Sequence, residues 1–195
     1  MPHLSAPLIL ASGSPRRKDL LEEAGYEIVV IPPEEEEVDD PSIPIGELTQ
    51  MNAMLKADCV AVDYAEAIVI AADTLVLRDG VALGKPADMK EAGSMIRSLN
   101  GRAHQVFTAV CVLQNATGFV EEFTVITDVQ FKQLTDAELD NYHKLIEPLD
   151  KAGAYAAQDH GELIIESIVG SQTNVVGLPM DEVNTVLERF TKQQG

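Results

Sequence analysis

An apolar stretch from Ala67 to Leu77, interrupted by one carboxylate at Asp73, is the feature that most constrains the fold of this chain. The stretch predicts a strand, and the Asp79-Gly80 pair that follows it predicts a two-residue hairpin turn into a second strand over 81–84. Because burying an unpaired carboxylate is unfavourable, Asp73 needs a metal ion, a cation or hydrogen-bond donors beside it. The alternative is that Asp73 lies at the end of the strand and caps a turn.

The hairpin also predicts which residues face each other across it. If the Asp-Gly pair forms the turn, Arg78 opposes Val81, and counting back places Thr74 opposite Lys85. The lysine is then expected within about one residue of Asp73, because strand registers can slip by one. At that position Lys85 forms either a plain salt bridge with the aspartate or the phosphate-binding half of a catalytic pair.

Periodic apolar residues and capping signals divide the rest of the chain into helices and strands. Helices are expected over 14–25, 48–62, 88–99, 135–146 and 179–190, and further strands over 8–12, 26–31, 105–113, 119–132, 162–169 and 173–176. In the second helix the residues at helical spacing are Leu48, Met51, Leu55, Cys59 and Val62. Helices and strands do not alternate regularly, so residues 1–195 are predicted to form a single mixed α/β domain with hairpins.

The segment Ser12-Gly13-Ser14-Pro15-Arg16-Arg17 joins the first strand to the first helix. Ser14 is a favourable N-cap, and proline is favoured at the first helical position. The free backbone N–H groups of such a helix start suit a phosphate. Arg16 and Arg17 oppose the helix macrodipole unless an anion binds there. The alternative is that both arginines point into solvent or pair with nearby glutamates.

Composition bears mainly on partners and location. The formal net charge of −18 repels nucleic acid and anionic membranes, although a local basic cluster can still hold a small anion. No apolar run approaches the roughly 20 residues that cross a bilayer, and the N-terminus lacks a secretory signal pattern. Cys59 and Cys111 are too few and too far apart for a disulfide scaffold or a zinc cluster. A cytoplasmic protein without nucleic-acid or membrane partners is therefore expected.

Three further features are weaker signals when each is taken alone. Lys56 borders the apolar face of its helix, where a solvated lysine is the ordinary interpretation. The glutamates of residues 34–37 are more typical of a solvated loop than of a metal site. The segment from Asp150 to Tyr155 follows a proline, and its small residues permit a close approach to the backbone.

In this order, these segments resemble the Maf family of nucleotide pyrophosphatases. The resemblance covers almost the whole chain and rests on Ser12 to Arg17, the acidic loop near Glu35, Lys56-Ala57, Ala72-Asp73-Thr74, Gly84-Lys85-Pro86, Asp150 to Tyr155 with Gln158, and Val176-Gly177-Leu178-Pro179. No single piece suffices, but the combination is highly specific. The chain departs from the family at Asp159-His160, where a glycine usually follows the glutamine, and at Ser171-Gln172-Thr173, where an aromatic residue is frequent.

The resemblance implies a fold, a reaction and a cofactor. The fold is an α/β architecture like that of inosine triphosphatase, with an elongated, twisted mixed sheet flanked by helices and two lobes around a cleft. The reaction is hydrolysis of a nucleoside triphosphate to the monophosphate and pyrophosphate. Mg²⁺, or another divalent cation such as Mn²⁺, is expected to bind Glu35 or a neighbouring glutamate together with Asp73. Related folds often form two-fold dimers, so a homodimer is a candidate assembly.

The resemblance also implies roles for individual residues. Asp73 matches the proton acceptor, and Arg16, Thr74 and Gln158 match positions tied to base selection. The substrate-binding positions are Ser12, Ser14, Arg16, Arg17, Lys56, Thr74, Lys85, Lys151 and Gln158. The Ser-Pro-Arg-Arg form and the glutamine are similar to the branch that acts on dTTP and UTP, which can stand in for modified pyrimidine nucleotides. The alternatives are a 7-methyl-GTP pyrophosphatase and a nucleotide-binding regulator of cell division, or septum formation, that needs no catalytic Asp73.

Overall fold

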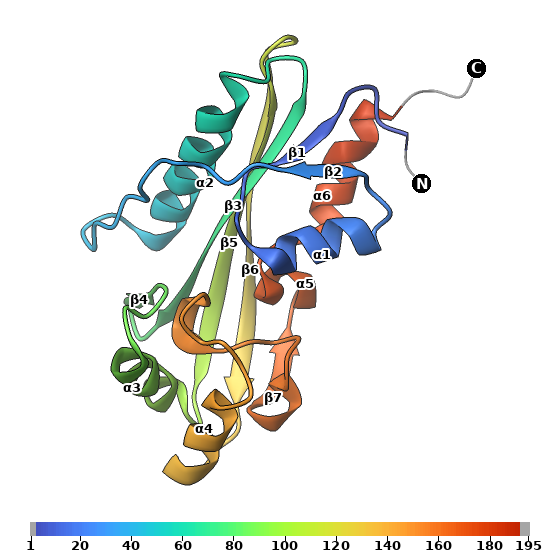
Figure 1. Ribbon diagram of the computed structural model, residues 1–195. Helices are drawn as coiled ribbons and strands as arrows, with labels where there is room; N and C mark the ends of the chain where they lie inside the picture. Colours follow the sequence, from blue (N-terminus) through green and yellow to red (C-terminus); the bar gives the residue numbers. More distant parts are fainter. Residues whose placement is uncertain (1–2, 192–195) are drawn as a thin grey trace. The chain divides into compact units, whose positions relative to one another are not determined.

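The computed structural model describes residues 3–191, which contain one seven-stranded mixed sheet and its flanking helices (Figure 1). The strands are β1 (Leu8–Leu10), β2 (Ile28–Val30), β3 (Ile68–Arg78), β4 (Val81–Leu83), β5 (Ala103–Gln114), β6 (Phe119–Phe131) and β7 (Ile165–Val169). The helices are α1 (Pro15–Glu23), α2 (Ile45–Ala61), α3 (Met89–Leu99), α4 (Asp136–His143), α5 (Gln172–Val176) and α6 (Met180–Leu187), with short 3₁₀ turns η1 (Ala152–Ala154), η2 (Gly161–Leu163) and η3 (Glu188–Phe190). The expected mixed α/β fold is confirmed.

The sheet follows the order β2-β1-β3-β5-β6-β7, with β4 paired to β3 beside this path. Strand β1 pairs in parallel with both β2 and β3, whereas β4 and β7 pair in antiparallel fashion with β3 and β6. The chain divides into two compact units, each assembled from separate segments. The first contains the residues up to Asp73, Thr108–Val125 and those from Gly177 on, and the second contains Thr74–Phe107 and Ile126–Val176.

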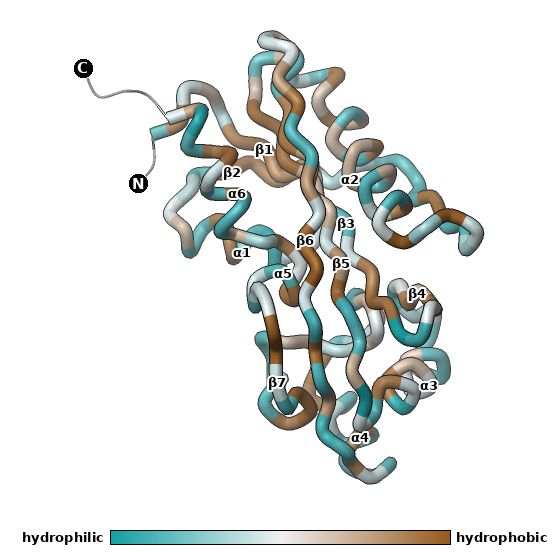
Figure 2. The backbone as a smooth tube through the Cα atoms, turned by 180° about the vertical axis from the view of Figure 1, so that it is seen from behind, coloured by the Kyte–Doolittle hydropathy of each residue, from teal (hydrophilic) through white to brown (hydrophobic). Residues whose placement is uncertain are grey.

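The core of the first unit lies on both faces of β1 and the first half of β3. Figure 2 shows β1 as strongly hydrophobic along its length. Because neighbouring residues of a strand point to opposite faces, Leu8 and Leu10 pack toward α1 and α6, while Ile9 packs toward α2. Two helical layers therefore bury this part of the sheet, and a polar side chain within it must find a partner there.

The buried face of α2 differs from the one that the spacing of its large apolar residues predicts. Met51 is 46 % exposed and Val62 is 71 % exposed, whereas the buried positions include Ala53, Ala57 and Lys56. The alanines have short side chains that allow the helix backbone to approach the sheet closely. Packing against the sheet thus selects the small-residue face and brings Lys56 inside with it.

The β3–β4 hairpin of the second unit has the predicted turn. Asp79 and Gly80 have φ values of 50° and 80°, as the two-residue turn requires, and Arg78 pairs with Val81. The register is therefore the predicted one, but the ladder ends at the pair formed by Val76 and Leu83 and does not extend to Thr74 and Lys85. Strand β4 ends at Leu83, and Lys85 lies in the segment between β4 and α3.

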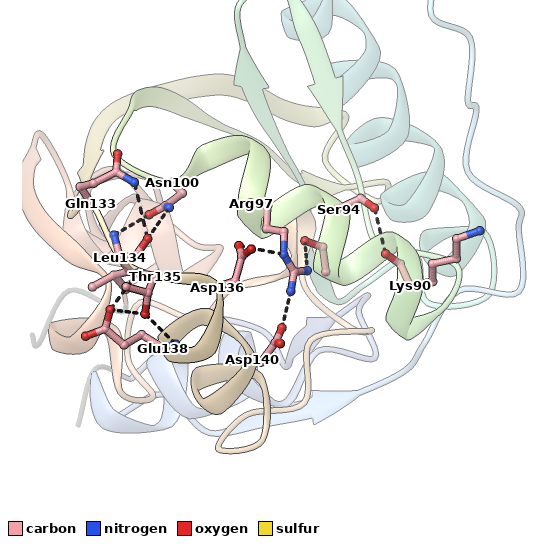
Figure 3. A network of polar contacts seen from close by, with 11 residues as sticks. Lys90, Ser94, Arg97, Asn100, Gln133, Leu134, Thr135, Asp136, Glu138 and Asp140 are labelled. Carbon is pink, nitrogen blue, oxygen red and sulfur yellow. Dashed lines mark hydrogen bonds and ion pairs between the residues drawn. The ribbon is translucent and has the colours of Figure 1, made fainter.

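Helices α3 and α4 are tied together by polar contacts at their ends (Figure 3). The Arg97 guanidinium donates to Asp136 at 3.3 Å and also to Asp140. At the start of α4, Thr135 and Glu138 form a reciprocal capping box, as their spacing predicts. The Asn100 side chain bonds both the N–H and the carbonyl of Leu134. These contacts fix α4 on α3 within the second unit.

The predicted strand over 173–176 is wrong, because these residues belong to the short helix α5. The Ser171 hydroxyl accepts a hydrogen bond from the Asn174 N–H at 3.2 Å and so caps the helix. The buried Asn174 amide donates to the Val106 carbonyl and to the Thr127 hydroxyl. In the part of the chain that the structure describes, no helix is long and apolar enough to cross a membrane.

Candidate active site

The turn between β1 and α1 brings Ser12 and Arg17 into contact. The buried Ser12 hydroxyl accepts hydrogen bonds from the Ser14 N–H at 3.2 Å and from the Arg17 guanidinium at 3.1 Å. Arg17 Nε also donates to the Gly177 carbonyl at 2.8 Å, which ties α1 to the segment before α6. These contacts give Arg17 fixed partners and determine the direction of its guanidinium.

The start of α1 is electropositive. Ser14 is the N-cap, as predicted, but its side chain accepts no capping hydrogen bond, and the first turn contains no acidic residue. Arg16 and Arg17 are half-buried there. Burial lowers the pKa of Arg17, and the carboxylates of Asp73 and Glu37 oppose that effect, so both act on Arg17 electrostatically. Free N–H groups and two arginines at a helix start form a suitable environment for a phosphate.

Asp73, the last residue of β3 that belongs to the first unit, is buried with Lys56 beside it. Lys56 Nζ donates to Asp73 Oδ1 at 2.6 Å and contacts Glu37 Oε1 at 2.7 Å. Asp73 and Lys56 are 5 % and 7 % exposed, so the interpretation of Lys56 as a solvated lysine is wrong. The cation that a buried Asp73 requires is therefore present, and it comes from α2.

The second carboxylate oxygen of Asp73 differs from the first. Among residues 3–191, Asp73 Oδ2 is buried and has no hydrogen-bond partner. An unpaired buried acceptor is unfavourable, and such atoms cluster at functional sites. One oxygen of this carboxylate is thus fixed by Lys56, and the other remains available to a ligand.

The acidic loop is positioned by Asn52, which no sequence pattern marked as functional. The buried Asn52 side chain accepts from the Val38 N–H at 2.8 Å and donates to the Val38 carbonyl at 3.0 Å. This pair fixes the loop next to α2 and places Glu37 at Lys56. All four consecutive glutamates are exposed, and Glu37 is the one for which an ion pair with Lys56 is found in the described chain.

A divalent cation fits this donor set only with help from a ligand. The described residues contain no group of three or more His, Cys, Asp or Glu side chains able to hold a metal. Mg²⁺ commonly uses one or two carboxylates and completes its shell with water and substrate phosphates. The free Asp73 Oδ2 and one glutamate of the acidic loop match that requirement.

The second unit carries Thr74, Lys85, Lys151 and Gln158. The Gly153 N–H donates to the Gly84 carbonyl at 3.0 Å, which joins the loop of Lys85 to the loop of Lys151. Lys85 is exposed, and Thr74, next to Asp73 in β3, is half-buried. The predicted substrate residues therefore fall into two groups, and consecutive residues of β3 connect them along the chain.

Lys151 and Gln158 have local partners in the second unit. The buried Lys151 ammonium donates to the Glu147 carbonyl and to Asp150 Oδ1, both at 2.7 Å. These bonds use two of the three N–H donors of the ammonium, so one donor remains for a phosphate. Gln158 is exposed, and its amide donates to Asp159 Oδ2 at 3.2 Å. The departure from the family pattern at Asp159 thus bears directly on the glutamine.

Comparisons with known proteins identify the family of the chain. Residues 7–190 match the model of a family described as Maf-like protein. The chain is 45 % identical over 177 residues to the dTTP/UTP pyrophosphatase of Akkermansia muciniphila, a match that covers 91 % of this chain and 93 % of the relative. It is 41 % identical over 185 residues to the dTTP/UTP pyrophosphatase of Dictyoglomus thermophilum, covering 94 % and 95 % of the two chains.

Among solved structures, the Staphylococcus aureus Ham1 protein superposes with a TM-score of 0.53 at 14 % identity, covering 94 % of this chain and 98 % of that one. At this identity the likeness concerns the fold alone. The family match and the relatives extend over nearly the whole chain, including every segment of the candidate site. The chain therefore belongs to the Maf family.

Proposed function

We propose that this chain hydrolyses nucleoside triphosphates to the monophosphate and pyrophosphate, with dTTP, UTP and modified pyrimidine nucleotides as substrates. The observation that carries the proposal is the Asp73 carboxylate, buried, fixed at Oδ1 by Lys56 and unpartnered at Oδ2 within the described chain. The names of the relatives support the reaction and the pyrimidine preference.

In the proposed reaction a water molecule attacks the α-phosphorus. A bond forms between the water oxygen and this phosphorus, and the bond from the α-phosphorus to the oxygen that bridges to the β-phosphate breaks. Asp73 accepts the proton of the water at Oδ2, while Lys56 holds the other oxygen and so orients the carboxylate. Pyrophosphate leaves with the bridging oxygen.

Cationic groups offset the charge that develops on the phosphates. We assign the N–H groups at the start of α1, with Ser12, Ser14, Arg16 and Arg17, to the triphosphate, and Lys85 and Lys151 to the leaving pyrophosphate. Arginine suits a two-point grip on phosphate, and lysine acts more as a point charge. Mg²⁺, held by Asp73 with Glu35 or Glu37, would supply Lewis-acid polarisation of the phosphate and a more acidic water.

We assign base selection to Arg16, Thr74 and Gln158. The Gln158 side chain ends in an amide, whose separate donor and acceptor groups match the edge of a uracil or thymine ring. Its bond to Asp159 is made by the amide nitrogen, so the carbonyl oxygen of the same side chain can still accept from the base. We place the activity in the cytoplasm, where the free Cys59 and Cys111 stay reduced.

The test is pyrophosphate release in the presence of Mg²⁺ from dTTP, UTP, CTP, ATP, GTP and 7-methyl-GTP. We expect release from dTTP and UTP and a loss of at least about a hundredfold in kcat for Asp73→Asn, with the binding of nucleotide that does not depend on Mg²⁺ largely retained. Asp63→Asn, at an exposed position of the same unit, is the matched control and should keep the native rate.

Each contrary outcome addresses a different part of the proposal. A near-native rate for Asp73→Asn would show that the base is another group. A preference for 7-methyl-GTP would keep the chemistry but overturn the roles of Arg16 and Gln158. Nucleotide binding without any pyrophosphate release would favour a regulatory protein instead of an enzyme.

A further inference from the structure

The short segment 154–156 lies between Lys151 and Gln158 in the sequence. Its backbone forms hydrogen bonds with side chains of the last turn of α4. The Tyr142 hydroxyl donates to the Ala156 carbonyl at 3.1 Å and accepts from the Ala156 N–H at 3.0 Å. The neighbouring His143 donates from Nε2 to the Ala154 carbonyl at 3.0 Å. Two consecutive side chains of one helix thus satisfy three backbone groups of the segment.

The middle residue of the segment is held from β5. The Tyr155 hydroxyl lies 2.9 Å from His104 Nε2, and the Tyr155 ring packs edge-on against His104 and Phe131. Each of the three consecutive residues is therefore fixed by a buried side chain from a distant part of the second unit.

The backbone of this segment is strained. Gly153 and Ala154 have φ values of 70° and 60°, in the left-handed region. Glycine adopts this conformation readily, but alanine does so at a cost in free energy, and such residues persist only where the surrounding structure imposes the shape. The contacts from α4 and β5 therefore maintain a conformation that the local sequence disfavours.

Burial favours the neutral forms of the groups that hold the segment. Burial lowers the pKa of His104 to about 4 and lowers the pKa of His143 as well. Burial raises the pKa of both Tyr142 and Tyr155, so their hydroxyls stay protonated. Helix α4 is itself fixed on α3 by Arg97 and by the capping box (Figure 3). Burial thus favours the neutral forms of these side chains, and α4, which carries Tyr142 and His143, is fixed on α3.

We propose that Tyr142 and His143 are positioning residues for nucleotide selection, acting through the segment 154–156. Gln158 lies two residues after Ala156, so the geometry of the segment determines where the chain presents the glutamine. Lys151 lies three residues before Ala154 and is located in the same way. The inference rests on the proposed function, in which Gln158 reads the base, and it adds residues that act on selectivity through this support.

The test compares Tyr142→Phe with Tyr26→Phe as a matched control. Tyr142 is 2 % exposed, and Tyr26 is 7 % exposed in the first unit, where its hydroxyl donates to Asn184 at 2.9 Å. Steady-state kcat and KM for dTTP and CTP are measured together with the melting temperature. We expect Tyr142→Phe to raise KM for dTTP and to reduce the preference for dTTP over CTP about fivefold to tenfold, the effect of a lost orienting hydrogen bond. Tyr26→Phe should lower the melting temperature without changing the preference.

A second pair of variants tests His143 by rescue. A glutamine side chain can place an amide nitrogen near the position of Nε2, so His143→Gln should keep the preference that His143→Leu loses. Amide exchange of residues 151–158 provides a readout that is independent of activity, and it should become faster in Tyr142→Phe and in His143→Leu.

The outcomes separate this inference from the proposed function. An unchanged preference in an active Tyr142→Phe protein, or an equal change in Tyr26→Phe, would overturn the positioning role and leave the proposed function intact. Unchanged amide exchange in Tyr142→Phe would overturn the anchoring on which the role depends. A native chain that hydrolyses no nucleotide would overturn the proposed function itself, and the selectivity role with it.

Discussion

Lys56 determines the environment of two carboxylates in the first unit. Its ammonium lies 2.6 Å from Asp73 and 2.7 Å from Glu37, and its side chain is only 8 % exposed. A buried ion pair adds little net stability relative to an apolar pair, but removing one partner leaves an uncompensated charge in a medium of low polarity. Lys56 therefore both supplies the opposite charge beside the buried Asp73 carboxylate and fixes the direction of that carboxylate.

Replacing Lys56 by methionine should reveal this dependence. We expect Lys56→Met to lower the free energy of unfolding by about 3 kcal/mol, because Asp73 is then buried without its cation. Urea denaturation at neutral pH measures the effect. Lys18→Met is the matched control: it removes a lysine that pairs with Glu22 at the surface of α1, and it should leave the midpoint unchanged. Equal midpoints for the two variants would contradict the buried charge pair.

Among the elements, the segment that contains η1 depends most on a single backbone conformation. At Gly153 a Cβ atom would lie 3.1 Å from Val76 Cγ2 and 3.4 Å from the Tyr155 ring, at a φ of 70°. The same glycine donates to the Gly84 carbonyl and so connects the loops of Lys85 and Lys151. Glycine is therefore needed at this position for two reasons, the backbone angle and the lack of space.

Gly153→Ala separates these reasons when it is compared with Gly118→Ala. Gly118 has a φ of 68°, but a Cβ atom added there meets no atom within 4 Å. We expect Gly118→Ala to destabilise the protein by about 1 kcal/mol through backbone strain alone. Gly153→Ala should destabilise by at least about 1 kcal/mol more because of the crowding. Thermal unfolding of both variants measures the difference, and an equal loss in the two would show that steric crowding at Gly153 is absent.

The individual helices and turns show how much of the fold could be predicted from the sequence. The Asp79-Gly80 turn and the start of a helix at Thr135 were predicted because both depend on local backbone chemistry within a few residues. The buried face of α2 and the helical state of residues 172–176 were not, because packing on the sheet and the Ser171 cap decide them. The burial of Lys56 was not predicted for the same reason. No pattern in the sequence indicated that Asn52 is buried.

At the scale of the whole molecule, the formal charge of −18 opposes the binding of another polyanion. The proposed substrate is a triphosphate, so the local cations at the start of α1 and on the loops of the second unit must act against this field. Screening by salt weakens the long-range repulsion more than it weakens contacts between buried groups. The stability of the free protein should therefore rise with ionic strength.

Because the net charge responds to any salt, specific binding of Mg²⁺ has to be distinguished from the general effect of ionic strength on stability. The described residues offer Mg²⁺ too few carboxylates for a complete protein site, and the remaining ligands are expected from the substrate phosphates. We expect MgCl₂ alone to raise the melting temperature no more than NaCl at equal ionic strength. Adding a non-hydrolysable α,β-methylene analogue of dTTP should produce a further, Mg²⁺-dependent increase, because a ligand stabilises only the state that binds it.

Differential scanning fluorimetry of the native chain and of Asp73→Asn completes this test. The variant should keep the increase caused by ionic strength and by the analogue alone, and lose most of the increase that needs Mg²⁺ and the analogue together. A specific stabilisation by Mg²⁺ without nucleotide would instead indicate a metal site made by the protein alone. Retention of the joint increase in Asp73→Asn would show that the metal binds through the phosphates and the acidic loop without Asp73.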